Sequence, residues 1–337
     1  MSIDLFLFDP TVLPVIFAGL MGLSILLYVI LDGFDLGVGL LVPFATPPEQ
    51  DRMIASIGPF WDANETWLVL AIGLLLVAFP AAHGAILGAL YLPVALMLVG
   101  LILRGVAFEF RAKSEGEGKR LWTQIFAAGS LLTGLTQGWM LGLYLSGLSW
   151  APGALAFAAL CALCLPAGYA LLGACWLIWK TGDGLQRKAV RWAKPALLGA
   201  GAGIAAVSIA TPIAHDSIAA KWFAWPEVIL LAPLPLMAAG LVAVLWVGLG
   251  ALPDREDRWR AAPFLAASAL VGTCFVGLTY SLYPQVVPGG PTIYETASAP
   301  ESLTIILVGV IVVMPIIAAY TLLSYRLFRG KARPLSY

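Results

Sequence analysis

The chain has 337 residues and no formal net charge; 61% of its residues are hydrophobic and 11% are charged. A soluble globular domain carries about 25% charged residues, so this composition excludes a soluble protein and indicates one that lies in lipid. The balanced charge gives no reason to expect a nucleic-acid partner. All four cysteines fall in apolar runs without histidines nearby in a metal-binding pattern, which argues against disulfides and a metal site.

A helix that crosses a bilayer needs about 20 apolar residues. The sequence therefore predicts an all-α integral membrane protein with nine spanning helices, at residues 12–43, 52–79, 84–111, 122–146, 152–179, 192–213, 226–250, 261–283 and 303–326. Proline and glycine inside these runs do not exclude spans, because lipid-embedded helices tolerate both residues.

The basic residues predict the orientation. With nine spans, 18 of the 19 Lys and Arg residues fall on one side of the membrane, and only Lys221 falls on the other. The side that is rich in Lys and Arg is normally cytoplasmic. The N-terminus is therefore expected in the periplasm and the C-terminus in the cytoplasm.

Four acids are embedded in the first two spans. Asp32 and Asp35 lie in the first, Asp62 and Glu65 lie in the second, and each pair is spaced i,i+3 on one helix face. Asp32 and Asp62 each lie about 15 residues from the turn near 46–48, so counting along two antiparallel helices predicts similar depths. The four carboxylates are expected to form a ladder along the membrane normal.

An acid at the centre of a lipid-exposed helix costs about 2.5–3.5 kcal/mol, so these acids are expected to face protein or water. One interpretation is a proton path or ion site. The other is a set of buried polar groups that hydrogen-bond to neighbouring helices through Asn64 and Trp61. Gly33 and Gly37 form a small-xxx-small pair that allows a neighbouring helix to approach closely.

The third span ends in a charged segment, LILRGVAFEFRAKSEGEGKR. Arg104 either extends its side chain to the membrane surface or turns inward to neutralise Asp35 or Asp62. In the second case, the charged residues that follow it are expected to form a hydrated mouth to the same path: Glu109, Arg111 and Lys113.

Haem in a membrane bundle requires His, Met or Cys ligands at mid-helix positions. The two histidines, His83 and His215, fall at external span ends, and the seven methionines have no histidine partners. The chain is therefore expected to bind no haem by itself.

Four motifs resemble subunit II of the cytochrome bd-type quinol oxidases: DGFDLGVG at 32–39, WDANETWLV at 61–69, RGVAFEFRAK at 104–113 and LYPQVVP at 282–288. The short loops are similar to those of the cyanide-insensitive branch. The resemblance implies a subunit of a respiratory enzyme of the bacterial inner membrane, which oxidises quinol and reduces oxygen to water with cytoplasmic protons. This chain is expected to carry out no catalysis alone.

The same resemblance implies the partners and the architecture. A haem-bearing subunit I holds two haems b and one haem d, and subunit II contacts it, membrane lipid and quinol. Some members hold a structural quinone in subunit II. The resemblance leaves open whether a small single-helix accessory subunit is present. Residues 1–146 and 147–283 are each expected to form a four-helix bundle, and residues 284–337 an external cap, a peripheral ninth helix and a basic cytoplasmic tail.

The motifs also imply site residues. Asp62 is the acid of the tryptophan-acid motif and the first choice for a proton carrier. Two departures are Ala63 in place of Gly and Phe60 where relatives often carry His. The proton path is expected at Asp62, Asp35, Asp32, Glu65, Glu109 and Lys113. Charge pairing and support are expected at Arg104, Arg111, Trp67 and Asn64. Glu65 is an additional acid to which the motif gives no role.

Two other functions are consistent with the embedded acids. A proton-coupled secondary transporter is one, but transporters usually carry related halves that meet at a shared midplane site. Here the embedded charge is confined to the first three spans, which disfavours that interpretation. A purely structural membrane scaffold is the other.

Overall fold

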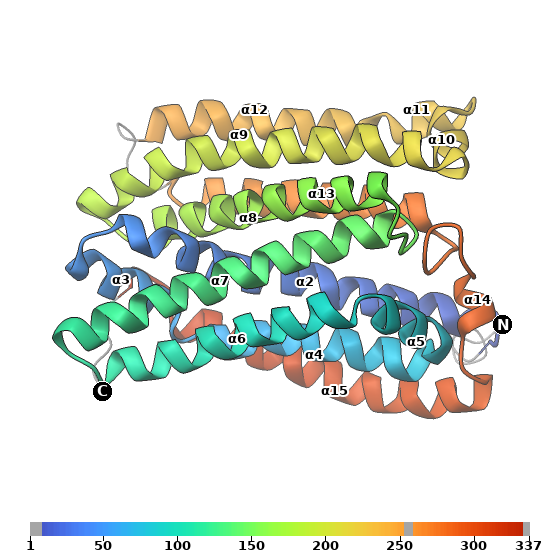
Figure 1. Cartoon of the computed structure of the whole chain (residues 1–337), viewed down its shortest axis with the longest axis horizontal. Coiled ribbons are helices and arrows are strands. Elements are labelled where there is room, and N and C mark those ends of the chain that lie inside the picture. Colours follow the sequence, from blue (N-terminus) through green and yellow to red (C-terminus); the bar gives the residue numbers. More distant parts are fainter. Residues whose placement is uncertain (1–8, 253–258, 333–337) are drawn as a thin grey trace.

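The structure is a computed structural model that describes residues 9–252 and 259–332. Long helices run roughly along one axis (Figure 1). The helices of the first half are α2 (Leu13–Leu41), η1 (Val42–Phe44), α3 (Pro47–Ile57), α4 (Trp61–Ala78), α5 (Pro80–Ala89), α6 (Tyr91–Ala112) and α7 (Gly116–Leu145). Those of the second half are α8 (Pro152–Lys180), α9 (Asp183–Ala214), α10 (Asp216–Phe223), α11 (Glu227–Leu231), α12 (Pro233–Ala251), α13 (Ala262–Leu282), α14 (Ile293–Thr296) and α15 (Pro300–Leu327).

Eight helical segments in the described ranges are long and apolar enough to cross a membrane: Leu13–Phe44, Trp61–Ala78, Tyr91–Ala112, Pro152–Lys180, Asp183–Ala214, Glu227–Ala251, Ala262–Leu282 and Pro300–Leu327. The remaining predicted span, 122–146, falls on α7, which has 30 residues but is not among these eight. The number of spanning helices, nine, and the orientation of the chain in the membrane therefore stay predictions.

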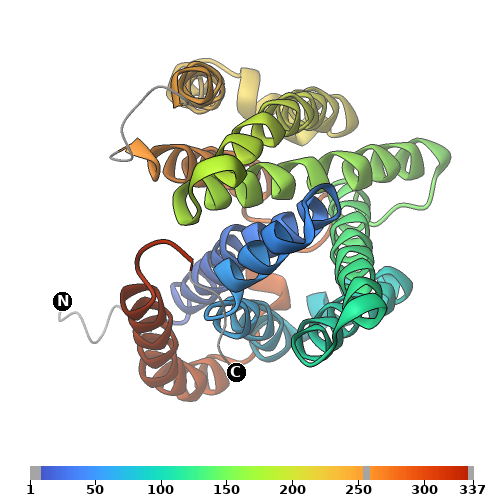
Figure 2. The ribbon, with the colours of Figure 1, turned by 90° about the vertical axis from the view of Figure 1, so that its left-hand side faces the viewer.

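Helix α2 lies in the middle of the molecule. It packs against α4, α7 and α8, and the end-on view shows it surrounded by the other helices (Figure 2). Helices α9 and α12 lie along one outer edge, and α4, α6 and α15 lie on the opposite side of α2 (Figure 1). Because the acids Asp32 and Asp35 belong to α2, this central position removes them from lipid.

Three predicted spans are interrupted, and the one expected at 226–250 is divided into α11 and α12 at Ala232. The second, expected at 52–79, is divided into α3 and α4, because Pro59 lacks the N–H that would continue the helix from Ala55. The third, expected at 84–111, is divided into α5 and α6, where the ring of Pro93 is incompatible with the carbonyl of Ala89 in a continuous helix. The break before α4 places Asp62 in the first turn of that helix.

The predicted close approach at the small-residue pair is confirmed. A Cβ atom on Gly37 would collide with the backbone carbonyl of Tyr169, and one on Gly173 would collide with the backbone of Gly37. Glycine at both positions lets α2 and α8 cross in backbone contact, which is how small residues promote helix packing in membranes.

Candidate functional site

A buried ion pair joins α2, α4 and α6. Arg104 Nη2 lies 2.6 Å from Asp32 Oδ1 and 3.3 Å from Glu65 Oε2. The Arg104 side chain is 2% exposed and that of Asp32 is fully buried, whereas Glu65 retains 29% exposure. Arg104 thus turns inward, as one of the two sequence interpretations proposed, but it neutralises a different pair of carboxylates from those expected.

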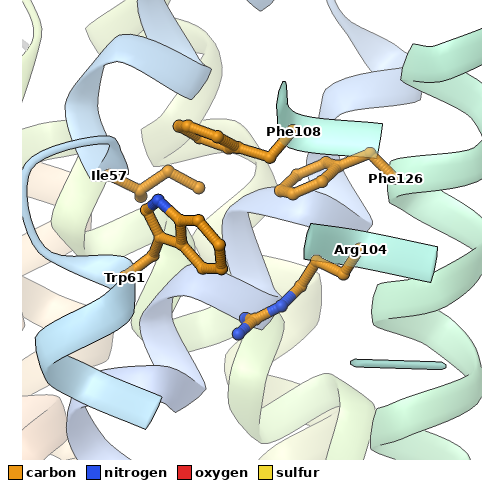
Figure 3. Close-up of a pocket in the computed structure, with 5 residues that line it drawn as sticks. All are labelled: Ile57, Trp61, Arg104, Phe108 and Phe126. Carbon is orange, nitrogen blue, oxygen red and sulfur yellow. The ribbon is translucent and has the colours of Figure 1, made fainter. Parts of the chain in front are cut away.

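A small pocket lies beside this ion pair. It is lined by Arg104 and by the apolar side chains Ile57, Trp61, Phe108 and Phe126, and it has no room for a further water-sized group. The guanidinium of Arg104 lies below the rings of Trp61 and Phe126 and points away from Phe108 (Figure 3). Apolar walls of this kind shield the ion pair from water and strengthen the attraction between its charges.

The second embedded aspartate takes part in a separate set of hydrogen bonds. Asn64 Nδ2 donates to Asp35 Oδ2 at 2.7 Å and to the carbonyl of Leu31 at 3.2 Å. Tyr325 Oη, from α15, donates to Asn64 Oδ1 at 3.0 Å, and its ring stacks on Phe60. Both ends of the Asn64 amide are therefore engaged, the nitrogen by α2 and the oxygen by α15.

The predicted ladder of four carboxylates is wrong in its register. Asn64 and Glu65, not Asp62, lie level with Asp35 and Asp32. Relative to α2, helix α4 is therefore displaced along its axis by about one turn from the position that counting residues predicts. The physical reason is α3, which occupies part of the length that the prediction assigned to the second span. Asp62 is exposed, and its carboxylate has no hydrogen bond or ion pair to the residues that the structure describes.

A third group of polar side chains lies on the other side of Asp32. Tyr28, one turn earlier on α2, accepts a hydrogen bond of 2.6 Å from Gln137 Nε2. Tyr169 Oη donates to Gln137 Oε1 at 2.5 Å. Gln137 of α7 thus joins Tyr28 of α2 to Tyr169 of α8, and this set of polar groups lies one turn from Asp32 along α2.

Several buried polar atoms in this region have no hydrogen-bond partner in the described chain. They include Asp32 Oδ2, Asp35 Oδ1, Trp67 Nε1 and two nitrogens of Arg104. Buried polar groups normally bind protein or ordered water, so these atoms are the ones in the described part of the site that are available to bind water. Trp67, expected as a support, lies buried, and its indole N–H has no acceptor among the described residues.

Charged pairs also surround the end of the bundle where α3 lies. Arg111 is buried and donates to Asp51 at 2.7 Å and to Thr123 at 2.9 Å, and Lys119 lies 2.9 Å from the same Asp51. The expected mouth is therefore only partly assembled: Arg111 is fixed by Asp51, while the other two residues, Glu109 and Lys113, are exposed.

On the same end, Lys188 of α9 binds Glu49 of α3 at 2.6 Å. The backbone N–H and the hydroxyl of Thr46 each donate to the same carboxylate at 2.8 Å. Burial by itself raises the pKa of Glu49, but the hydrogen bonds from Lys188 and Thr46 outweigh it and lower this pKa from 4.5 to about 2. The pair links α3 to α9.

This pair predicts an acid-dependent loss of stability. A carboxyl whose pKa is lowered by folding stabilises the protein above its unfolded value, here 4.5, and the contribution disappears as the pH falls towards 2. We expect a loss of about 1 kcal/mol after allowance for solvent screening. Thermal unfolding of the purified protein in detergent, measured against pH, checks this. Glu49→Gln is expected to weaken the pH dependence in this window, and an unchanged profile would contradict it.

Four residues of the embedded site were not predicted from the sequence: Tyr28, Gln137, Tyr169 and Tyr325. Tyr28 was detectable, because it precedes Asp32 by four residues on the same helix face. Gln137 carried a weaker signal as a polar residue in an apolar segment. Tyr325 carried none, since 261 positions separate it from Asn64. The described residues contain no group of three or more His, Cys, Asp or Glu that would hold a metal ion.

Three relatives of this chain are described as subunit 2 of a cytochrome oxidase. "Cytochrome bd ubiquinol oxidase subunit 2" of Bacillus subtilis is 42% identical over 105 residues, which cover 30% of this chain and 31% of that protein. "Cytochrome bd-I ubiquinol oxidase subunit 2" of Escherichia coli K12 is 35% identical over 142 residues, covering 41% and 38%. The chain thus aligns with about a third of the length of these two relatives. "Probable cytochrome oxidase subunit 2" of Haemophilus influenzae is 28% identical over 345 residues, covering 89% and 90%.

The fold has a counterpart among solved structures. A chain in the structure of bd oxidase from Geobacillus thermodenitrificans superposes with a TM-score of 0.76 at 18% identity, covering 94% of this chain and 98% of that one. The family model for cytochrome bd terminal oxidase subunit II matches residues 13–328. With its eight long apolar helices and its bacterial relatives, the chain is a multi-pass protein of the bacterial inner membrane that belongs to the cytochrome bd terminal oxidase subunit II family.

Proposed function

We propose that this chain is subunit II of a quinol:oxygen oxidoreductase, which supports a haem-bearing subunit I and supplies part of a cytoplasmic proton path for the reduction of oxygen to water. The observation that carries the proposal is the buried cluster of Asp32, Asp35, Glu65 and Arg104 inside the helices of a protein of this family. Ionisable groups within a membrane are expensive, and they mark ion or proton pathways.

The proposed contact surface for subunit I lies on α4 and α6. Asp62 and Glu109 are both exposed there and lie close enough to interact electrostatically. A carboxylate that faces lipid is strongly unfavourable. The face is therefore proposed to be covered by the partner subunit, which would leave the two acids at the junction between the chains.

Within this arrangement, the proton route begins at the exposed residues of the α6 end, Glu109 and Lys113. It continues to Asp62 at the junction and to the buried cluster around Arg104. Carboxyl groups can accept and release protons along such a route, and the unpaired oxygens of Asp32 and Asp35 are suited to bind the water molecules that connect them. Arg104 holds a compensating positive charge throughout.

The two haems b and the haem d are proposed to lie in subunit I. His215 does not fit an axial ligand, because its Nε2 is 2.6 Å from the carbonyl oxygen of Leu145 and engaged with it. When bound in the partner, the haems supply the electron transfer and oxygen chemistry. This chain contributes a contact surface for that subunit and carboxyl groups that bind and release protons. A structural quinone and a small accessory subunit are proposed as additional partners of the complex.

Co-purification tests this proposal. We expect a complex isolated through an affinity tag on this chain to show haem b and haem d bands in a redox difference spectrum and to consume oxygen with quinol as reductant. The same membranes from a strain that lacks the haem-bearing partner serve as the control. A tagged chain that is recovered without either haem band would overturn the assignment.

A structural scaffold is the second candidate, and one observation favours it. The Asp32–Arg104–Glu65 and Asp35–Asn64–Tyr325 contacts join α2, α4, α6 and α15, which is what a purely architectural role requires. Asp62 distinguishes the proton path from the scaffold, because its side chain forms no hydrogen bond or ion pair with another helix among the described residues.

A further inference from the structure

A second cluster of charges lies far from the embedded acids, on the outer edge of the molecule. Helix α9 carries a cleft of about 390 Å³ that is lined by Arg187, Val190, Arg191 and Lys194. The spacing i, i+4 and i+7 places the three cations on one face of the helix. Figures 1 and 2 show α9 and α12 along the edge opposite α4, α6 and α15. The cleft is thus remote from the face proposed for subunit I.

Among the residues that the structure describes, the three cations have no anionic partner. Neither an ion pair nor a hydrogen bond engages Arg187, Arg191 or Lys194, whereas Lys188, on another face of the same helical segment, is paired with Glu49. Three positive charges around one cleft repel each other unless an anion lies between them. The described lining of the cleft therefore has the charge of an anion receptor and includes no acid.

The position of the cleft along α9 determines what kind of anion reaches it. Residues 195–214 of this helix contain no charged residue, and Leu198, one turn beyond Lys194, is 60% exposed. Arg187 and Lys194 are about 10 Å apart along the axis, which is comparable to the thickness of a lipid headgroup layer. Trp192 lies between them, as is typical of helices at a membrane interface.

We propose that this cleft binds the headgroup of an anionic phospholipid, with its acyl chains along the exposed apolar surface of α9. Arginine forms bidentate hydrogen bonds with phosphate, and two arginines and one lysine suit a headgroup that carries more than one phosphodiester, such as cardiolipin. Basic pockets beside spanning helices are a general means of recognising such lipids. The bound lipid would fix the α9–α12 edge in the membrane.

Lipid binding to the intact oxidase complex in phosphatidylcholine nanodiscs or detergent tests the proposal, with cardiolipin titrated and bound lipid counted by native mass spectrometry. Each cation near an anionic headgroup contributes a factor of about five in affinity. The variant R187Q/R191Q/K194Q is therefore expected to bind cardiolipin roughly 100-fold more weakly. A photoactivatable cardiolipin is expected to label the segment 187–198 of the wild-type chain and not of this variant.

The matched control is R120Q/R326Q/R329Q, which removes three exposed cations from the same end of the molecule but leaves the cleft intact. It is expected to retain the wild-type affinity, and both variants are expected to retain oxygen consumption. An equal loss of affinity in both variants would show a general effect of charge and overturn the site. Displacement of the lipid by inorganic phosphate at equal concentration would overturn the assignment to a lipid.

Discussion

Replacing Arg104 with methionine is expected to destabilise the protein by about 3–5 kcal/mol and to prevent assembly of the complex. The substitution leaves Asp32, which is fully buried, without its ion-pair partner at 2.6 Å. Asp35, which is also fully buried and feels the same positive charge, loses its compensation as well. The yield of intact complex on size-exclusion chromatography and its thermal unfolding midpoint measure the effect.

A double variant provides the control for this result. Asp32→Asn in the Arg104→Met background removes the uncompensated charge, so it is expected to recover part of the lost stability. Arg104→Lys is expected to be intermediate, since a lysine keeps the charge but not the planar group that reaches both Asp32 and Glu65. An Arg104→Met protein of wild-type stability would show that the pair contributes nothing to the fold.

Replacing Asp62 with asparagine is expected to lower quinol-driven oxygen consumption by roughly 100-fold, the scale of a lost proton-transfer group. Assembly and thermal stability are expected to stay unchanged, because the Asp62 carboxylate is exposed and makes no hydrogen bond or ion pair within the described residues. Oxygen-electrode rates, normalised to the haem content of the purified complex, measure the effect. The separation of activity from stability is what distinguishes a proton carrier from a structural acid.

The control for Asp62 is Asp183→Asn. Asp183 is another exposed acid, at the start of α9, and its φ of 53° is a conformation that asparagine tolerates well. We expect this variant to consume oxygen at the wild-type rate. If Asp62→Asn also did so in an intact complex, the proton path through this residue would be refuted and the scaffold would be the better interpretation.

Several helices were predictable from hydropathy alone. The spans expected at 152–179, 261–283 and 303–326 correspond to α8, α13 and α15, which differ from them by at most three residues at each end. These are long apolar runs, and the prolines inside α8 and α15, Pro166 and Pro315, do not end the helices. The breaks before Trp61 and Tyr91 were missed because prolines are tolerated within membrane helices, so a single sequence does not reveal which proline ends a helix.

The candidate site was predictable in its residues more than in its contacts. The i,i+3 pairs identified Asp32 and Asp35 as groups that avoid lipid, and both are buried. Their partners depended on the depth of α4, which an unrecognised α3 shifted by about one turn. Contacts between distant segments, such as that between Tyr325 and Asn64, arise only from tertiary packing and leave no periodic pattern in the sequence.

The hydrogen bond from Tyr325 to Asn64 has a consequence for biosynthesis. A chain emerges from the ribosome N-terminus first, so Asp35 and Asn64 enter the membrane long before α15 exists. Until the last helix arrives, the amide oxygen of Asn64 lacks its donor and the ring of Phe60 lacks the Tyr325 ring on which it stacks. Lys180 is in a similar position, because it donates to the carbonyl of Phe328, beyond the end of α15. A polypeptide that stops early is therefore left with exposed polar groups inside the bilayer, a mark by which membrane quality control can distinguish it from a finished one.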